Sequence, residues 1–119
     1  MAELIVALDL PDADAANAWV RRLDTTVDFW KIGLELFSVH GPRMVRDVTA
    51  RNKRVFLDLK LHDIPRTVER AVLAGAAMGV EMMTVHASGG RAMICAAAEA
   101  ARSAGARRPR ILAVTMLTS

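Results

Sequence analysis

The sequence predicts an α/β fold, and more narrowly about the first half of a (β/α)8 TIM barrel. Strand-like and helix-like segments alternate along all 119 residues, and the strands begin near residues 4, 27, 54, 81 and 110. Several strands are apolar on both faces, which is typical of a parallel sheet covered by helices. A complete barrel needs about 250 residues. We therefore interpret residues 1–119 as the N-terminal half of a single barrel domain, with an open doubly wound sheet as the other architecture that fits the alternation.

Each element is predicted from its local sequence. The strands are short apolar runs at residues 4–8, 27–33, 54–60, 81–86 and 110–116. The helices are predicted from apolar residues three and four apart, or from a proline in the first turn. They cover residues 12–23, the stretch after Pro42, the stretch from Pro65, and residues 92–104. The first helix is expected to bury one face, formed by Ala15, Ala16, Trp19, Val20 and Leu23.

Composition excludes several classes of protein. Apolar residues make up 53% of the chain, enough for a packed core and too many for a disordered chain. The single cysteine, Cys95, excludes an internal disulfide framework, suggests a cytoplasmic location and is expected to be a small buried residue. No apolar run approaches the ~20 residues of a membrane span. We expect no nucleic-acid partner, because the only tight basic cluster is interpreted as a solvated helix end and loop, at Arg102, Arg107, Arg108 and Arg110.

Polar residues gather where the predicted strands end. Asp9, Lys31, Asp58, Lys60 and His86 all lie at carboxyl ends, the side of α/β barrels where ligands bind. Asp58 and Lys60 are two residues apart in one strand, so they are expected on the same face. A structural ion pair is the alternative for these two residues.

Three further features bear on this end of the sheet. Asp63 completes a D-x-K-x-x-D pattern, and it directly precedes Ile64-Pro65, where an aspartate also fits as a helix cap. His86 is interpreted as a satisfied structural histidine. The first strand runs into Asp9-Leu10-Pro11 without a glycine, which argues against a dinucleotide site.

Five segments carry a family resemblance. Residues 56–68, FLDLKLHDIPRTV, resemble the signature of the orotidine 5′-monophosphate decarboxylases. The same family pattern is matched by VALD at residues 6–9, KIG at 31–33, TVHASGG at 84–90 and VTMLTS at 114–119. The matches follow the expected order from residue 4 to residue 119.

The resemblance implies a (β/α)8 homodimer that converts orotidine monophosphate to UMP in pyrimidine biosynthesis, without cofactor or metal. By motif, Lys60 would donate the proton to C6 and Asp58 would lie against the substrate carboxylate. Asp9 and Lys31 would bind ribose hydroxyls. Lys31 would also belong to the charged array, and Lys31 and Asp63 would count with Lys60 and Asp58 as catalytic residues. Asp63 and Thr67 would reach the partner subunit's site. The remaining substrate-binding residues implied are Ile64 and Thr118, with Ser119 as the alternative to Thr118 against the base.

Two alternatives stay open. One is a Mg²⁺-dependent sugar-phosphate decarboxylase of the same superfamily, which resembles a family with Glu at the position of Lys31; a lysine there would repel the cation. The other is a non-catalytic half-barrel fragment. In the family, the phosphate-gripping loops come from strands six to eight, which the 119 residues do not contain. A half barrel is expected to leave two open strand edges and an uncovered apolar face.

Overall fold

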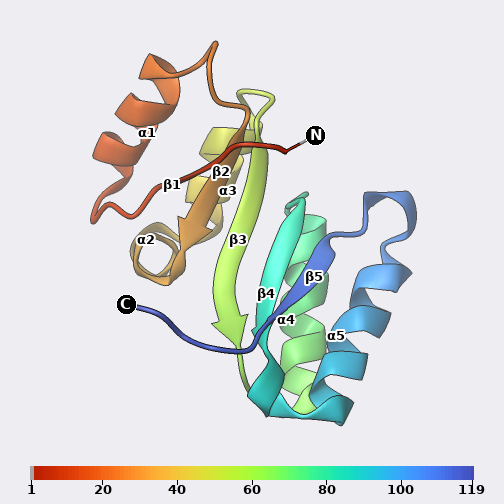
Figure 1. The fold of residues 1–119 in the computed structure, drawn as a ribbon. Helices are drawn as coiled ribbons and strands as arrows, with labels where there is room; N and C mark the ends of the chain where they lie inside the picture. The colour runs from red at the N-terminus through yellow and green to blue at the C-terminus, as the bar shows by residue number, and fades with distance from the viewer. Residues whose placement is uncertain (1) are drawn as a thin grey trace. The chain divides into compact units, whose positions relative to one another are not determined.

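The computed structural model describes residues 2–119, in which parallel strands alternate with helices (Figure 1). The chain forms two compact units, one ending at Asp58 and the other beginning at Leu59. Strand β3 (Arg54–Leu61) begins in the first unit and ends in the second. Across residues 2–119, none of the helices combines the length and the apolar character that a bilayer crossing requires.

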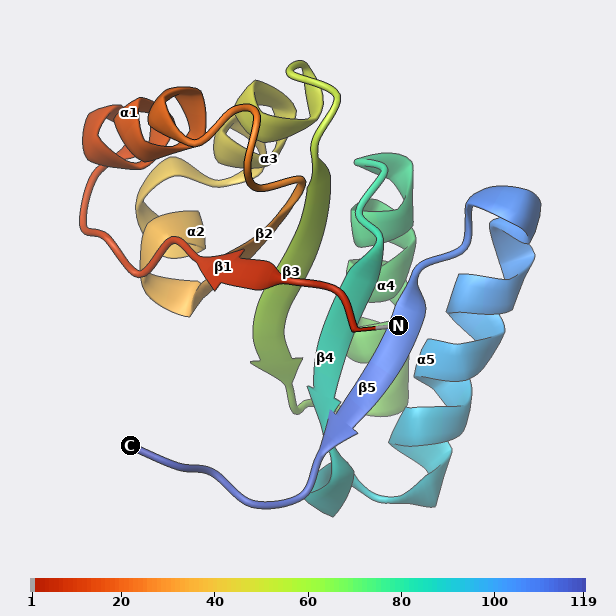
Figure 2. The same ribbon diagram turned by 45° about the horizontal axis from the view of Figure 1, so that its top comes forward.

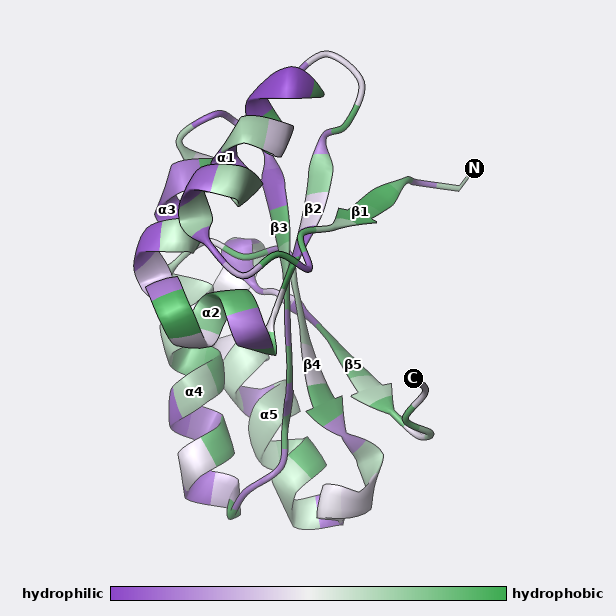
Figure 3. Ribbon diagram, turned by 90° about the vertical axis from the view of Figure 1, so that its left-hand side faces the viewer, coloured by the Kyte–Doolittle hydropathy of each residue, from purple (hydrophilic) through white to green (hydrophobic). Residues whose placement is uncertain are grey.

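The first unit contains β1 (Ile5–Ala7), α1 (Ala13–Arg22), β2 (Phe29–Gly33), α2 (Leu34–His40), α3 (Pro42–Thr49) and the start of β3. The strands pair in parallel, β1 with β2 and β2 with β3. This register sets Ala7 opposite Lys31 and Gly33 opposite Asp58. The three helices lie on one side of these strands (Figure 3). The register therefore brings the carboxyl ends of three strands to one edge.

The core of the first unit is built on β2. Phe29, Trp30 and Ile32 have no exposed surface, and each contributes about 1.5–3 kcal/mol through burial. The helices add their buried residues, Ala16 and Val20 from α1 and Met44, Val45 and Val48 from α3. The start of α1 is fixed by Asp12, whose Oδ1 accepts the Ala15 N–H at 2.7 Å.

The second unit contains the end of β3, α4 (Pro65–Ala77), β4 (Met82–His86), α5 (Arg91–Ser103) and β5 (Arg110–Val114). Two 3-10 turns, η1 (Ala87–Gly89) and η2 (Gly105–Arg107), flank α5. β4 and β5 pair in parallel, and α4 and α5 lie side by side behind them (Figure 2). A side chain at Gly75 would overlap the Met83 thioether, so this glycine lets α4 approach β4 closely.

Burial differs sharply between β4 and β5. Met82, Met83 and Val85 in β4 are buried, whereas β5 has no buried residue and Leu112 is 39% exposed. In the first unit, Ile5 and Val6 of β1 are only partly buried and Ala7 is exposed. The exposure of both terminal strands agrees with the open apolar surface expected of a half barrel.

The structure corrects four details of the sequence prediction. Helix α2 was not predicted, because it follows β2 directly, with Gly33 as both the last strand residue and the helix N-cap. Trp19 is 44% exposed instead of buried, and the Arg22 guanidinium lies 5.2 Å from its ring centroid. Cys95 is exposed on α5. The predicted strands at residues 4–8, 27–33 and 110–116 are shorter in the structure by two residues each.

Candidate active site

In the first unit, three sequence-predicted residues form one cluster. The Lys31 ammonium on β2 lies 3.3 Å from Asp9 Oδ1, just beyond β1, and 3.4 Å from Asp58 Oδ2 on β3. The two carboxylates differ in exposure: the Asp58 side chain is 10% exposed and that of Asp9 is 68% exposed. Lys31 therefore joins a buried carboxylate to one that faces solvent. The convergence predicted for these three residues is confirmed.

The geometry of this cluster leaves room for a ligand. Charge-assisted N–H···O bonds are usually about 2.7–2.9 Å long, so both contacts of Lys31 are loose. An ammonium has three donors, and these two contacts leave one N–H for another acceptor, such as a hydroxyl. Gly33 keeps the space open, because a Cβ there would lie 3.3 Å from Asp9 Oδ1 and 3.4 Å from Lys31 Nζ.

In the second unit, Lys60 has an unusual backbone. Its φ is +49° although it is not a glycine. This conformation costs about 1–3 kcal/mol and persists only where the surrounding structure holds it. The Lys60 N–H donates to the Thr84 hydroxyl oxygen at 2.9 Å. Thr84 lies in β4 and is only 3% exposed. Strand alternation predicts the Lys60 side chain on the same face as that of Asp58, and this positive φ departs from the extended backbone on which that prediction depends.

The segment after Lys60 carries the remaining residues of the motif. Asp63 Oδ1 accepts the Ile64 N–H at 2.7 Å, and Ile64, not Asp63, is the N-cap of α4. The alternative of Asp63 as a helix cap is thus wrong: Pro65 occupies the first helical position, so the cap falls one residue later than Asp63. Asp63, Ile64 and Thr67 are all exposed, with Ile64 at 65%.

Two histidines stack beside this segment. The ring centroids of His62 and His86 lie 5.7 Å apart, and the interplanar angle is 23°. His86 Nδ1 accepts the Ser88 N–H at 3.1 Å, which agrees with its interpretation as a satisfied structural residue. Thr118 and Ser119 follow β5 and are exposed.

Sequence reasoning missed Gly33 and Thr84 as parts of the site. Gly33 stood in the quoted KIG segment, but its role depends on the tertiary approach of Asp9 and Lys31. The sequence offered a way to identify Thr84, because it is the one residue with a hydroxyl beside the buried apolar residues Met82, Met83 and Val85. A buried hydroxyl needs a hydrogen-bond partner, and that requirement marks it for attention.

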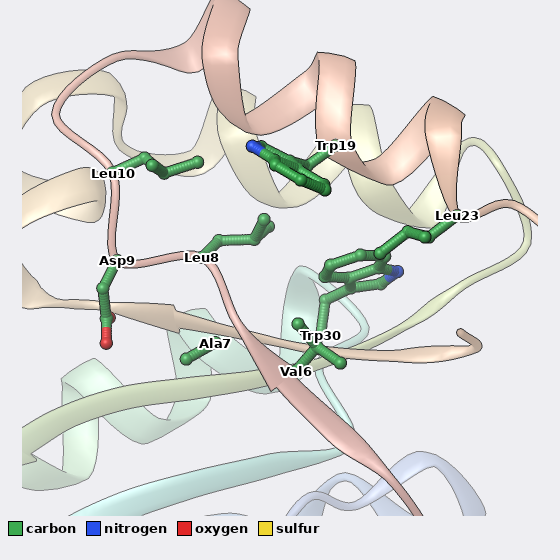
Figure 4. Close-up of a pocket in the computed structure, with 8 residues that line it drawn as sticks. All are labelled: Val6, Ala7, Leu8, Asp9, Leu10, Trp19, Leu23 and Trp30. Carbon is green, nitrogen blue, oxygen red and sulfur yellow. The ribbon is translucent and has the colours of Figure 1, made fainter. Parts of the chain in front are cut away.

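A separate cavity lies between β1 and α1 in the first unit (Figure 4). It has a volume of about 290 Å³ and is lined mainly by apolar residues, including Trp19, Leu23 and Trp30. The Asp9 carboxylate points away from these rings in Figure 4. The Trp30 indole N–H is buried and has no hydrogen-bond partner within residues 2–119. This cavity is therefore mainly apolar, unlike the charged cluster around Lys31, although Asp9 belongs to both.

The fold and the cluster define the class of protein: half of an α/β barrel, with a lysine between two aspartates at the carboxyl ends of its strands. The chain belongs to the orotidine 5'-phosphate decarboxylase / HUMPS family, whose model matches residues 2–119.

Known proteins of similar sequence and structure support this assignment. An orotidine 5'-phosphate decarboxylase from Nostoc sp. is 50% identical over 121 residues, which cover 98% of this chain and 50% of the relative. A crystal structure of the Lactobacillus acidophilus orotidine 5'-phosphate decarboxylase matches with a TM-score of 0.86 and 38% identity, over 99% of this chain and 55% of that one. An uncharacterised conserved protein from Geobacillus kaustophilus matches with a TM-score of 0.90 and 44% identity, over 97% of this chain and 55% of that one. The chain spans about half the length of the curated relatives that it matches.

Proposed function

We propose that residues 1–119 supply the lysine–aspartate part of an active site that decarboxylates orotidine 5′-monophosphate to UMP, a step of de novo pyrimidine biosynthesis in the cytoplasm. The observation that carries the proposal is the Lys31 ammonium between Asp9 and Asp58, at 3.3 and 3.4 Å. Family membership over residues 2–119 supports it. Lys60 follows Asp58 by two residues in the same strand, β3.

The chemistry needs a cation at C6 of the pyrimidine. When the bond from C6 to the carboxylate breaks, CO₂ leaves and the electron pair stays on C6, in the plane of the ring. The ring π-system delocalises this pair poorly, so a preorganised charge must stabilise it. The Lys60 ammonium supplies that charge and then donates its proton to C6, giving UMP. This scheme requires no cofactor.

The aspartates and Lys31 have separate tasks in this proposal. Asp58 lies against the substrate carboxylate and raises the energy of the ground state, a smaller contribution than that of Lys60. Asp9, with its side chain 68% exposed, and Lys31, with one remaining N–H, hold ribose hydroxyls. Binding of these remote groups positions the reacting carbon.

The proposal includes a homodimer in which Asp63 and Thr67 act in the partner subunit's site. Their exposure, together with the 65% exposure of Ile64, suits residues that contact another molecule. Ile64 contributes an apolar contact to the substrate, and Thr118 contacts the base.

Within the same family, a Mg²⁺-dependent sugar-phosphate decarboxylase is the competing assignment. Lys31 argues against it, because a lysine between Asp9 and Asp58 occupies with positive charge the place where carboxylates would bind a divalent cation. EDTA is therefore expected to leave turnover unchanged. If EDTA abolishes turnover, the metal-dependent reaction is favoured.

The test is decarboxylation of orotidine monophosphate, followed by ultraviolet absorbance. Because the chain spans about half of its relatives, two forms are assayed: the 119-residue chain alone, and a chimera in which it replaces the matching half of the Nostoc relative. The parent relative is the positive control. Turnover by either form supports the proposal. A folded chimera without turnover, beside an active parent, would contradict it.

A further inference from the structure

We propose that Thr84 is a positioning residue for Lys60: its hydroxyl oxygen holds the Lys60 backbone in the left-handed conformation that aims the ammonium. The proposal rests on the function proposed above, in which Lys60 delivers the proton. Its structural basis is the 2.9 Å hydrogen bond from the Lys60 N–H to Thr84 Oγ1 and the φ of +49° at Lys60. Both residues belong to the second unit.

The backbone at Lys60 needs an external support. Lysine side chains disfavour positive φ, because the Cβ atom crowds the backbone there. Such conformations persist where neighbouring groups fix them, and they concentrate at functional sites. At Lys60 the N–H is accepted by a side-chain oxygen, so the identity of one residue on β4 decides whether this support exists.

Packing alone does not explain a threonine at position 84. Its neighbours on β4 are Met82, Met83 and Val85, all buried and apolar. Valine has nearly the same shape as threonine and would avoid burying a hydroxyl. The hydroxyl is the feature that valine lacks, and its oxygen accepts the bond from Lys60.

β4 supports the same segment at a second point. Thr84 and His86 are two residues apart in the strand, so their side chains emerge on one face. Thr84 holds the backbone of Lys60, and the His86 ring stacks on His62, 5.7 Å away. Side chains on one face of β4 thus contact residues 60–62 at two points. The Thr84 hydroxyl makes the contact to Lys60 itself.

Loss of the hydroxyl is expected to release this conformation. Without the Thr84 oxygen, the Lys60 backbone can relax toward extended geometry, which turns its side chain. A displacement of about 1 Å at a reacting group can lower the rate roughly 100-fold. Substrate binding through Asp9 and Lys31 does not involve Thr84, so the loss should appear in kcat and not in KM.

The first test measures the contact itself, by hydrogen exchange at the Lys60 amide in the 119-residue chain. In the unmodified chain this amide is expected to be protected. Thr84→Val should accelerate its exchange at least about tenfold, whereas Thr84→Ser and the exposed control Thr26→Val should not. If the Lys60 amide of the unmodified chain exchanges as fast as an unstructured peptide, the proposal fails, whether or not any variant folds.

The second test measures turnover of orotidine monophosphate in whichever form is active. Thr84→Val should lower kcat by about 10- to 100-fold with KM changed less than about threefold, and Thr84→Ser should restore kcat to within about threefold. Lys60→Ala separates the two hypotheses. If Lys60→Ala retains turnover, the proposed role of Lys60 fails. If Lys60→Ala is inactive but a folded Thr84→Val protein has normal kcat, only the role of Thr84 fails.

Discussion

In the first unit, a cation lies between two carboxylates at the amino ends of the three strands. A second cation lies between two other carboxylates at their carboxyl ends. At the amino ends, Arg54 of β3 lies 2.9 Å from Glu3 Oε1 and 2.9 Å from Asp28 Oδ2. Its guanidinium also lies 4.4 Å from the centroid of the Phe29 ring. At the carboxyl ends, Lys31 of β2 takes the central place, at 3.3 and 3.4 Å from its two carboxylates.

The two cations differ in what they leave for a ligand. The planar guanidinium of Arg54 is held at short distance by both carboxylates and stacks on an aromatic ring, which suits a structural role. The Lys31 ammonium is held loosely and retains a donor. Barrels place their active sites at the carboxyl ends and use the opposite face for stability. We therefore propose that the Arg54 cluster contributes to stability and that the Lys31 cluster contributes to function.

The pKa of Arg54 is that of a guanidinium that stays charged at ordinary pH. Burial lowers the pKa of the guanidinium, but hydrogen bonds to Asp28 and Glu3, together with the charges of both, raise it more. The net pKa lies above its ordinary value. Because the folded-state pKa is raised, the contribution of Arg54 to stability is complete below its unfolded pKa and is lost only as the pH rises through the folded one. That window lies above the pH of any ordinary assay.

The largest effect is expected at the proposed proton donor. Lys60→Ala removes both the charge beside C6 and the proton, so kcat/KM should fall by about 10³-fold or more. Circular dichroism should remain that of the unmodified protein, because the Lys60 side chain is exposed. Turnover within tenfold of the unmodified protein would remove Lys60 from the chemistry.

The next effect is expected at the centre of the carboxyl-end cluster. Lys31→Met keeps much of the side-chain length but leaves Asp9 and Asp58 without their shared cation. We expect kcat/KM to fall about 100-fold. Unchanged kcat and KM, measured by the ultraviolet assay, would place Lys31 outside the site.

A mixing experiment tests the proposed partner subunit. Asp63→Ala and Lys60→Ala proteins, each inactive, should recover about a quarter of full activity when mixed one to one, because half of the random dimers contain one intact site. Mass spectrometry of the mixture verifies subunit exchange. If exchange is complete and no activity returns, Asp63 does not act in the partner's site.

The smallest effect on activity is expected at the amino ends. Arg54→Met removes the contacts to Glu3 and Asp28, and should lower the free energy of unfolding by about 1 kcal/mol, since these carboxylates are more than half exposed. Turnover per folded molecule should stay within about twofold. Arg54→Lys is the matched control that keeps the charge but loses the planar fork.

The regular part of this architecture was predictable from the sequence. Strands that are apolar on both faces occur at near-regular intervals, and their polar residues fall near the carboxyl ends, so the contact of Lys31 with Asp9 and Asp58 could be foreseen. Helix α2 could not, because it has no connecting loop and no side-chain cap. Trp19 shows a related limit: its spacing fits the apolar face of α1, yet it lies at the margin of that face.

The conformation of Lys60 was beyond sequence reasoning for a different reason. Nothing in the residues of β3 favours a left-handed lysine, since the stabilising oxygen comes from Thr84, 24 residues further along the chain. The same holds for Cys95, whose exposure depends on how α5 packs. The local sequence pattern predicts helices and strands. The Lys60 conformation and the exposure of Cys95 depend on contacts between segments that are distant in the sequence.

The most direct test of the account measures Lys31→Met and Arg54→Met side by side, each for its free energy of unfolding in urea and its kcat/KM with orotidine monophosphate. This division of roles predicts about a 100-fold loss of kcat/KM for Lys31→Met and less than about twofold for Arg54→Met, compared at equal fractions folded as calculated from the free energies of unfolding. Equal losses of activity in the two variants, at equal fractions folded, would contradict the division of roles between the two ends of the strands.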